Sequence, residues 1–171
     1  MKKDIRKITN LALLTSMALA ISLLEHMIPI PVPIPGAKLG LSNMVLLISL
    51  YIYGFKEALV IGVLKSFLLM LITGSVSSFF YSVTGAILAT IFMALSMNFA
   101  MKFLSFVGIS EIGAFFHNLG QILVAIFVMD NIKMLIYFPA LVVMGIFTSF
   151  FVGLSVNYII AHMDKIKFGE V

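Results

Sequence analysis

Lys65 lies near the middle of a long apolar stretch, residues 58–73. If that stretch crosses a membrane, a charge near its centre costs roughly 2.5–3.5 kcal/mol on insertion scales. We therefore expect Lys65 to face the interior of the protein. There it either pairs with a carboxylate or a backbone carbonyl, or contacts an anionic or polar ligand in a cavity.

A second group of polar side chains lies in the stretch 112–129. His117, Asn118 and Gln121 fall on one helical face with small residues, and His117 and Gln121 are neighbours at spacing four. The opposite face is apolar: Phe115, Phe116, Leu119, Ile122, Leu123 and Phe127. One histidine and two amides are too few for a metal site. The pattern predicts either a buried hydrogen-bond network or contacts to a ligand.

A proline-rich segment precedes these stretches, with four prolines in the seven residues 29–35. Alternating prolines give a stiff, extended chain with few free amide donors. The segment is apolar, and Glu25 and His26 precede it while Lys38 and Asn43 follow it. We interpret it as a lid across the mouth of a helical bundle, or alternatively as a rigid connector.

Catalytic motifs are absent from the sequence. Asp occurs only at positions 4, 130 and 164, so no aspartate-rich motif for a diphosphate and magnesium is present. No ATP-binding loop, metalloprotease motif or nucleophile elbow is found, and without Cys there is no thiolate nucleophile. The sequence therefore predicts no enzyme, no catalytic residue, no metal and no cofactor.

Composition identifies the elements that must position these residues. Of the 171 residues, 62% are hydrophobic and 11% are charged, and mean hydropathy is +1.19. Soluble domains are about 45–50% apolar and about 25% charged. A fold of this size cannot hide so much apolar surface from water, which excludes a soluble enzyme, a nucleic-acid-binding module and a disordered tail. We predict a polytopic, all-α membrane protein.

Six stretches are long enough to be membrane spans, which need roughly 20 mainly apolar residues. We place them at 8–28, 39–53, 58–73, 79–101, 112–129 and 134–160, in a single transmembrane domain, residues 1–171. Two alternatives stay open. The second and third spans are short, so a single bent or re-entrant segment would also fit. The first span also resembles a signal peptide, with a basic start and Ala18-Leu19-Ala20.

The positive-inside rule predicts the orientation. With six spans and an inside N-terminus, most basic residues fall in inside segments: Lys2, Lys3, Arg6, Lys7, Lys56, Lys102, Lys165 and Lys167. Lys38 and Lys133 fall outside, and Lys65 lies within a span. We therefore expect a multi-pass protein of the cell membrane with both termini in the cytoplasm.

Small residues at spacing four allow membrane helices to approach closely. Such stripes occur in the first span (Ala12, Ser16, Ala20), the fourth (Ser78, Ser82, Gly85, Ala86, Ala89, Met93) and the sixth (Gly145, Ser149, Gly153). Any one stripe either packs inside the bundle or docks another membrane subunit. The first span is the best candidate for docking, because its stripe is long and near the cytoplasmic side.

Several motifs resemble the signature of the bacterial "Gx transporter" family, also labelled heptaprenyl diphosphate synthase component I. They are Pro35-Gly36-Ala37-Lys38-Leu39-Gly40-Leu41-Ser42-Asn43, Gly54-Phe55-Lys56-Glu57-Ala58-Leu59, Ser82-x-x-Gly85-Ala86, Gly113-Ala114-x-x-His117-Asn118-x-Gly120-Gln121 and Tyr137-x-Pro139. The resemblance runs from about residue 8 to 155. His-Asn-x-Gly-Gln is its most specific part.

That family is similar to the substrate-binding S-components of energy-coupling factor (ECF) importers. The resemblance implies six helices, a ligand site open to the outside, a first helix that packs on a coupling membrane subunit, and separate ATPase subunits. It also leads us to expect arginine in relatives at position 65, where lysine keeps the charge but loses the planar fork.

The leading hypothesis is therefore an S-component that captures a small organic molecule in the bilayer and binds no nucleic acid. The predicted polar contacts are Lys38, Asn43, Lys65, His117, Asn118 and Gln121, with the two lysines favouring an anionic group. His117 and Asn118 have a structural role as the alternative. A vitamin, a cofactor, or a quinone or prenyl precursor would fit. The other hypotheses are a membrane subunit assisting long-chain prenyl diphosphate synthesis and a solitary facilitator.

Overall fold

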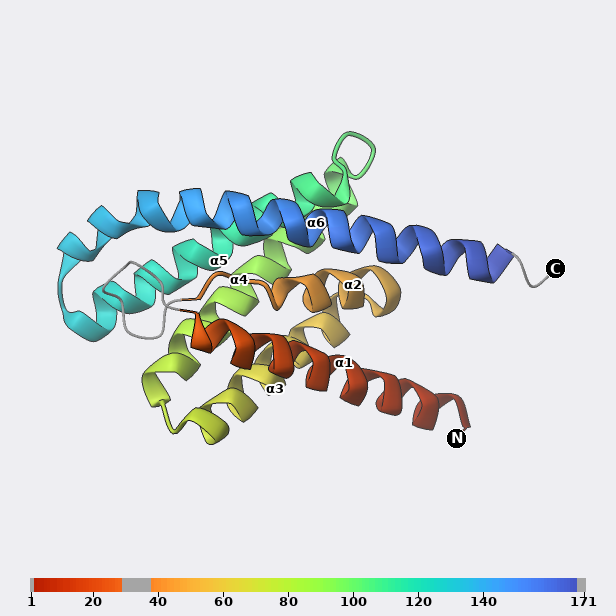
Figure 1. The fold of residues 1–171 in the computed structure, drawn as a ribbon, viewed down its shortest axis with the longest axis horizontal. Helices are drawn as coiled ribbons and strands as arrows, with labels where there is room; N and C mark the ends of the chain where they lie inside the picture. The colour runs from red at the N-terminus through yellow and green to blue at the C-terminus, as the bar shows by residue number, and fades with distance from the viewer. Residues whose placement is uncertain (1, 29–37, 169–171) are drawn as a thin grey trace.

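The computed structural model describes residues 2–28 and 38–168, and the side chains of residues 5–28 and 38–163. Within these residues every regular element is a helix. Their order is α1 (Lys2–Met27), α2 (Asn43–Tyr53), α3 (Phe55–Thr73), α4 (Val76–Ala100), α5 (Phe106–Met129), the 3₁₀ helix η1 (Ile132–Tyr137) and α6 (Phe138–Phe168). The helices form the elongated bundle of Figure 1. The prediction of an all-helical fold is confirmed for this part of the chain. The predicted proline-rich lid falls outside the described residues.

Among the described residues, four stretches of helix are long and apolar enough to cross a membrane: Ile5–Met27, Val76–Ala100, Phe106–Met129 and Ile132–Met163. Their outer surfaces expose many large apolar side chains, among them Leu24, Phe127 and Phe147. In water such a surface would be unfavourable, whereas in a bilayer it faces acyl chains. The protein is therefore embedded in a membrane.

The second predicted span differs from the structure. Its helix begins at Asn43 rather than at residue 39, so α2 has only 11 residues. At 1.5 Å per residue it is about 16 Å long, shorter than a hydrocarbon core of about 30 Å. The last span also differs, because η1 precedes α6, which continues to Phe168. The count of six complete spans stays a prediction.

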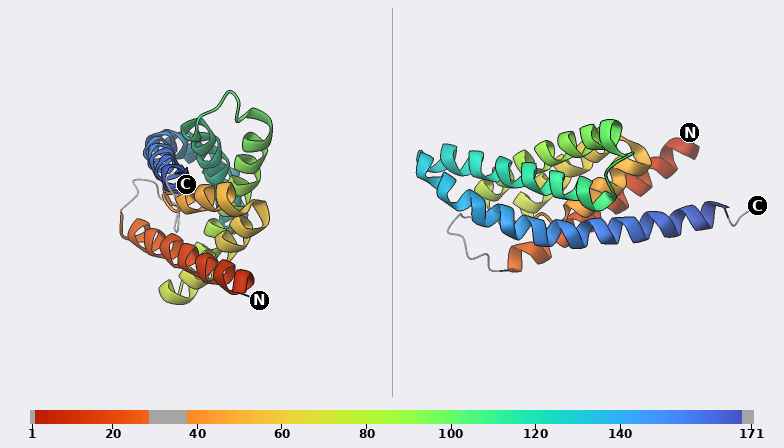
Figure 2. Two further views of the ribbon diagram at one scale, coloured as in Figure 1. Left: turned by 90° about the vertical axis from the view of Figure 1, so that its right-hand side faces the viewer. Right: turned by 90° about the horizontal axis from the view of Figure 1, so that it is seen from above.

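The short helix α2 occupies the centre of the bundle. It contacts α1, α3, α4, α5 and α6, and nearly all of its side chains between Asn43 and Leu50 are buried. A helix that is apolar on all sides is suited to burial among other helices. At Gly54, with φ of 96°, the chain reverses directly into α3. The two views of Figure 2 show the surrounding helices from the end and from above.

Small residues bring the long helices together. A Cβ added at Gly153 of α6 would lie 2.4 Å from the Cα of Val107 in α5, and one added at Gly120 would lie 3.0 Å from the Cα of Gly85 in α4. The small residues predicted as stripes in the fourth and sixth spans are buried. Those two stripes therefore pack inside the bundle.

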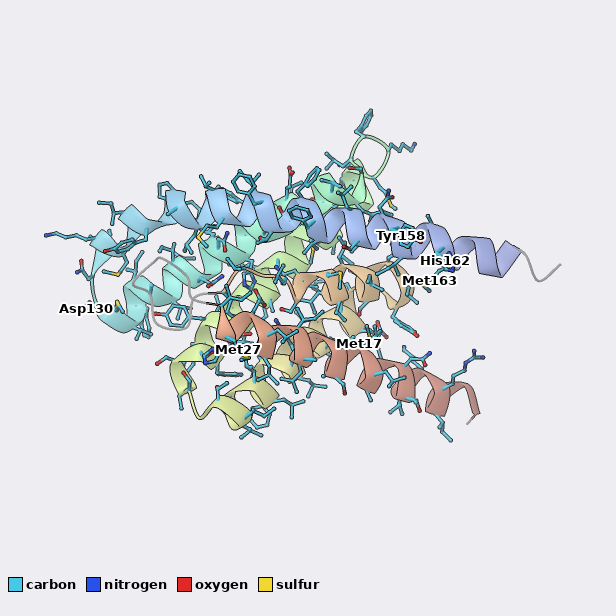
Figure 3. The ribbon with its side chains drawn as sticks, viewed as in Figure 1. Met17, Met27, Asp130, Tyr158, His162 and Met163 are labelled. Carbon is cyan, nitrogen blue, oxygen red and sulfur yellow. The ribbon has the colours of Figure 1, made fainter. Side chains whose placement is uncertain are left out.

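Different helix ends and turns lie at the two ends of the bundle. The starts of α1 and α3 meet at one end, where the Lys7 ammonium lies 2.6 Å from the Glu57 carboxylate. The end of α6 lies there too, and the turn at Asp130 lies at the opposite end (Figure 3). This grouping agrees with the two sets of connections that the basic residues predict. Which end faces the cytoplasm stays a prediction.

Candidate functional site

A cluster of buried polar side chains lies inside the bundle, around the non-helical residues 38–42 that lead into α2. We call it the polar cluster, and define it as Ser22, Glu25, Lys38, Ser42, Asn43, Lys65, His117, Asn118 and Gln121. All nine are at most 4% exposed. They come from α1, α2, α3, α5 and the 38–42 segment. The fold therefore brings together residues that lie up to about a hundred positions apart in the sequence.

The 38–42 segment is held by side chains instead of by a helix or sheet. The backbone N–H of Lys38 donates to the Gln121 Oε1 at 2.7 Å, and the Gln121 Nε2 donates to the Lys38 carbonyl at 2.9 Å. Thr148 of α6 donates to the carbonyl of Leu39 at 3.1 Å. Irregular backbone inside a membrane protein must find such internal partners, since lipid offers none.

Glu25 holds the same segment from the other side. Its Oε1 accepts the backbone N–H of Gly40, and that of Leu41 at 2.9 Å. Gly40 has φ of +84°, a conformation that favours glycine. A Cβ at Gly40 would lie 2.9 Å from the Asn43 amide nitrogen and 3.4 Å from the His117 ring. Gly40 thus lets the segment pass close to both polar side chains.

Lys65 lies fully inside the bundle, as the sequence predicts. Its ammonium donates to the Ser42 hydroxyl at 2.5 Å and to the Ser22 hydroxyl at 3.4 Å. No carboxylate lies within ion-pair distance of it among the described side chains. The ammonium has three donors, so one remains after these two hydrogen bonds. Lys65 is held in position and keeps a donor for another group.

Four members of the polar cluster have buried polar atoms without a hydrogen-bond partner in the described part of the chain. They are the Glu25 Oε2, the Lys38 Nζ, both amide atoms of Asn43 and both ring nitrogens of His117. Leaving a buried polar group unpaired costs about 1–3 kcal/mol, and native proteins avoid it. Six such atoms in one cluster make it the candidate binding site of the described part of the chain.

Gly85 makes room for the His117 ring. A Cβ at Gly85 would lie 2.6 Å from the His117 Nδ1. Two further unpaired atoms are the hydroxyls of Ser78 and Tyr81 on α4. Tyr81 precedes Gly85 by one helical turn and Ser78 precedes it by two. These two hydroxyls are therefore further buried polar groups, on α4, that have no hydrogen-bond partner among the described residues.

The charge of the site is set by Lys38, Lys65 and Glu25. Lys38 lies in the connection between α1 and α2, outside the helices. Its burial and the nearby Lys65 ammonium lower the pKa of Lys38 to about 7, and the Glu25 carboxylate opposes this shift. An acidic ligand group would favour the protonated form of Lys38 and gain a charge-assisted hydrogen bond.

The six predicted contact residues all lie in the polar cluster, but they do not all have the same role. Lys38, Asn43 and His117 have free polar atoms, and Lys65 keeps one donor. The Asn118 amide donates to the Leu141 carbonyl at 2.8 Å, and its oxygen accepts from Gln121 at 3.3 Å. Asn118 and Gln121 thus hold the site together, which is the structural alternative for Asn118. Both ring nitrogens of His117 lack a hydrogen-bond partner among the described residues, and its role stays a prediction.

Sequence reasoning missed Glu25, Ser22 and Ser42 as members of the site. The signal for Glu25 and Ser22 was present, because they share one face of the first helix with Thr15 and Ala18. All four are buried and follow helical spacing. Ile122, which we placed on the apolar face of the helix opposite the polar residues, is fully buried, so that face is not turned wholly to lipid. Among the described side chains, no three His, Cys, Asp or Glu residues form a metal-binding group.

The predicted docking stripe lies apart from the polar cluster. Ala12, Ser16 and Ala20 are exposed on the outer face of α1. Ala12 and Ser16 border a groove of about 420 Å³ between α1 and α3, whose other side includes Leu64 and Leu68. The face that α1 turns inward carries Thr15, Ala18, Ser22 and Glu25 instead. Helix α1 therefore presents one face to the site and another to its surroundings.

Comparison with known proteins gives one match. The model of the family described as heptaprenyl diphosphate synthase component I matches residues 14–159. This range contains every residue of the polar cluster. No curated protein matches the chain, and no solved structure matches it.

Proposed function

The chain belongs to the heptaprenyl diphosphate synthase component I family, and we propose that it binds a small organic molecule as the S-component of an ECF-type importer. The observation that carries the proposal is the polar cluster, with six unpaired atoms on four side chains that are at most 4% exposed. Ligand sites of membrane transporters are commonly formed where helices are interrupted near the middle of the bilayer. The 38–42 segment is not a break within a helix, but it is likewise non-helical backbone enclosed by helices, where it leads into α2.

Its position inside the bundle supports this role. Gln121, which holds Lys38, precedes the end of α5 at Met129 by eight residues, or about 12 Å at 1.5 Å per residue. Lys38 and Lys65 supply positive charge there, and Asn43 and His117 supply hydrogen bonds. Each of these groups is desolvated before the ligand arrives. We expect a ligand with an acidic group to gain most from them.

Uptake requires partners, because the sequence has no ATP-binding motif. The outer face of α1 (Ala12, Ser16 and Ala20) supports docking of a coupling membrane subunit, which would in turn contact the ATPase subunits. Small exposed residues let a second helix approach closely, and the adjacent groove offers space for its side chains. The cell membrane, with both termini cytoplasmic, is the location that this role requires.

Affinity purification of the full chain from its native membranes in mild detergent tests this function. Recovery with an ATPase pair and a coupling membrane subunit would support it. Ala12→Leu should reduce that recovery while leaving the polar cluster intact. Ala140→Leu, at an exposed position of α6, is the matched control. Purification without such partners, and without any bound small molecule, would contradict the proposal.

A second candidate function is support of long-chain prenyl diphosphate synthesis. It rests on the description of the matching family as a heptaprenyl diphosphate synthase component. In that case the chain would anchor or assist a synthase rather than catalyse, since it has no aspartate-rich diphosphate motif. Recovery with a prenyl synthase in the same purification, and a rise in synthase activity when the chain is added back, would favour this candidate over import.

A further inference from the structure

We infer that the ligand of the polar cluster carries an amide-type edge, an N–H beside a C=O, together with an acidic group. This inference rests on the proposed function and narrows the class of molecule. It follows from which polar atoms of the site lack a hydrogen-bond partner, and from whether each of them donates or accepts hydrogen bonds.

The free atoms include both donors and acceptors. The Lys38 ammonium and the Asn43 amide nitrogen donate, whereas the Glu25 Oε2 and the Asn43 amide oxygen accept. A neutral His117 ring adds one donor and one acceptor. A molecule that only accepts would satisfy the donors and leave the buried acceptors unpaired, at a cost. The ligand must therefore also donate.

Asn43 gives the most specific requirement. It is 4% exposed, and both of its amide atoms are free. A side-chain amide in this state pairs with an N–H/C=O or N–H/N edge through two parallel hydrogen bonds, as it does with the edge of adenine in nucleic-acid recognition. Gly40 borders both this amide and the His117 ring, so a ligand edge paired with Asn43 would lie beside the 38–42 segment.

Glu25 determines which molecules are rejected. One of its oxygens is already used by the backbone N–H groups of Gly40 and Leu41, so the carboxylate cannot turn away. The other oxygen is free and buried. A diphosphate or a quinone would bring only acceptor oxygens near it, and like charge or unpaired acceptors disfavour binding. An N–H or O–H donor would be favoured there.

Lys38 and Lys65 favour the acidic group. Both are buried in the polar cluster, and the Lys65 ammonium and the Glu25 carboxylate lie close enough to Lys38 to shift its pKa in opposite directions. A carboxylate of the ligand at Lys38 would place its negative charge by the two cations, with the amide edge at Asn43. Glu25 and Asn43 thus become residues that select the ligand, in addition to the lysines that attract it.

The test uses three probes with the purified full chain, stripped of bound small molecules. Orotate has amide edges and a carboxylate, benzoate has a similar ring and carboxylate without the edges, and geranyl diphosphate is an acceptor-only anion. In calorimetric titrations, orotate should bind at least about tenfold more tightly than either other probe, a difference of about 1.4 kcal/mol. Equal affinities, or no binding of orotate at about 10 mM, would overturn the inference.

Variants assign the preference to the two selecting residues. Asn43→Leu should remove the advantage of orotate over benzoate, whereas Asn157→Leu, at an exposed position, should keep it. Glu25→Gln can still accept from Gly40 and Leu41 but turns the free atom into a donor, so geranyl diphosphate should gain affinity relative to orotate. Thermal unfolding checks that each variant is folded. Unchanged ratios in folded variants would overturn the assignment.

Failure here is distinguishable from failure of the proposed function. Exact-mass analysis of a ligand that co-purifies with the chain provides the distinction. A bound acid without nitrogen in its formula would overturn the amide edge while small-molecule binding stands. A chain without any bound molecule or import partner would contradict the proposed function itself.

Discussion

Lys38 and Lys65 lie in the same cluster, but their ammonium groups are satisfied to different extents. Lys65 donates to the hydroxyls of Ser42 and Ser22, while the Nζ of Lys38 has no partner among the described residues. Lys65 is positioned by the fold, whereas under the proposed function Lys38 is free to contact a ligand. This difference predicts that ligand binding depends on pH through the ammonium of Lys38.

Binding of an acidic ligand should weaken as pH rises above 7. The pKa of Lys38 in the free protein is about 7, so higher pH removes the charge that attracts the ligand, by up to about tenfold in affinity per pH unit. Glu25, Lys65 and His117 are the other titratable groups of the cluster. Titrations between about pH 6.5 and 9 with the co-purified ligand measure this effect.

Lys38→Gln is the matched variant for that experiment. The affinity of this variant for the acidic ligand should be lower than that of wild type at neutral pH. It should not change as pH rises further, because the variant lacks the group that titrates. In the wild type without ligand, the free energy of unfolding should rise from about pH 7 to 10.5, since the unfolded chain binds the extra proton there. A wild-type affinity that stays constant to pH 9 would contradict this role of Lys38.

The buried polar residues were the part of the site that the sequence could predict. Lys65, His117 and Gln121 are too polar to face acyl chains, so their burial follows from solvation alone. The role of Glu25 was harder to predict. It lies near the end of α1, where a carboxylate can reach water, and only the path of residues 38–41 shows that it is enclosed.

At the scale of elements, the break before α2 is the feature that makes the site. The stretch 39–53 is mainly apolar, so its overall composition did not show that the helix begins at Asn43 instead of at residue 39. Gly40, at φ of +84°, and the side chains of Glu25 and Gln121 together hold residues 38–41 outside a helix. These partners are distant in the sequence, and a local pattern does not contain them.

Gln121→Ala should loosen this break. The substitution removes both hydrogen bonds to the backbone of Lys38, so the amides of residues 38–42 should exchange hydrogen faster while those of α4 remain protected. Hydrogen–deuterium exchange with mass spectrometry measures both. Asn157→Ala serves as the control. If residues 38–42 keep wild-type protection, Gln121 is not what holds the segment.

The faces of the helices were predicted well where residues are polar or small, and less well where they are apolar. Ile122 shows why. Lipid is as apolar as the protein interior, so an isoleucine has no strong preference between them. Small residues are more informative, because a tight helix contact tolerates little else. Gly153 in α6 faces the backbone of Val107.

Gly153→Ala should therefore destabilise the bundle. The added Cβ would meet the Cα of Val107 at 2.4 Å and the carbonyl oxygen of Phe106 at 3.0 Å, so α5 and α6 must separate. Overpacking of this kind costs about 1–3 kcal/mol, visible as a lower melting temperature in detergent. Ser155→Ala, at an exposed position of α6, should change it little. Equal melting temperatures would show that α6 accommodates the methyl group.

For the whole molecule, the distribution of charge predicts which end faces the cytoplasm. The starts of α1 and α3, with the Lys7–Glu57 ion pair, share one end with the end of α6, and Asp130 marks the other (Figure 3). Because the natural chain has no Cys, single cysteines can report on each end without background.

Lys133→Cys should react with a membrane-impermeant maleimide in intact cells, and Lys102→Cys should react only after permeabilisation. Both lysines are exposed. Lys102 lies in the connection between α4 and α5, and Lys133 lies in η1, which follows the turn at Asp130. The gel shift of labelled protein gives the result, with the Cys-free wild type as the blank. The reverse pattern would place the basic end outside and contradict the proposed orientation.

The polar cluster should hold a ligand if the chain binds a small molecule, and native mass spectrometry of the full chain in mild detergent tests this claim most directly. Wild type should carry a bound small molecule. Lys65→Ala should lose at least about tenfold in occupancy, as expected for one charge-assisted hydrogen bond, whereas the exposed-lysine control Lys56→Ala should retain it. The same ligand at the same occupancy in folded Lys65→Ala, or no ligand on wild type, would contradict the claim.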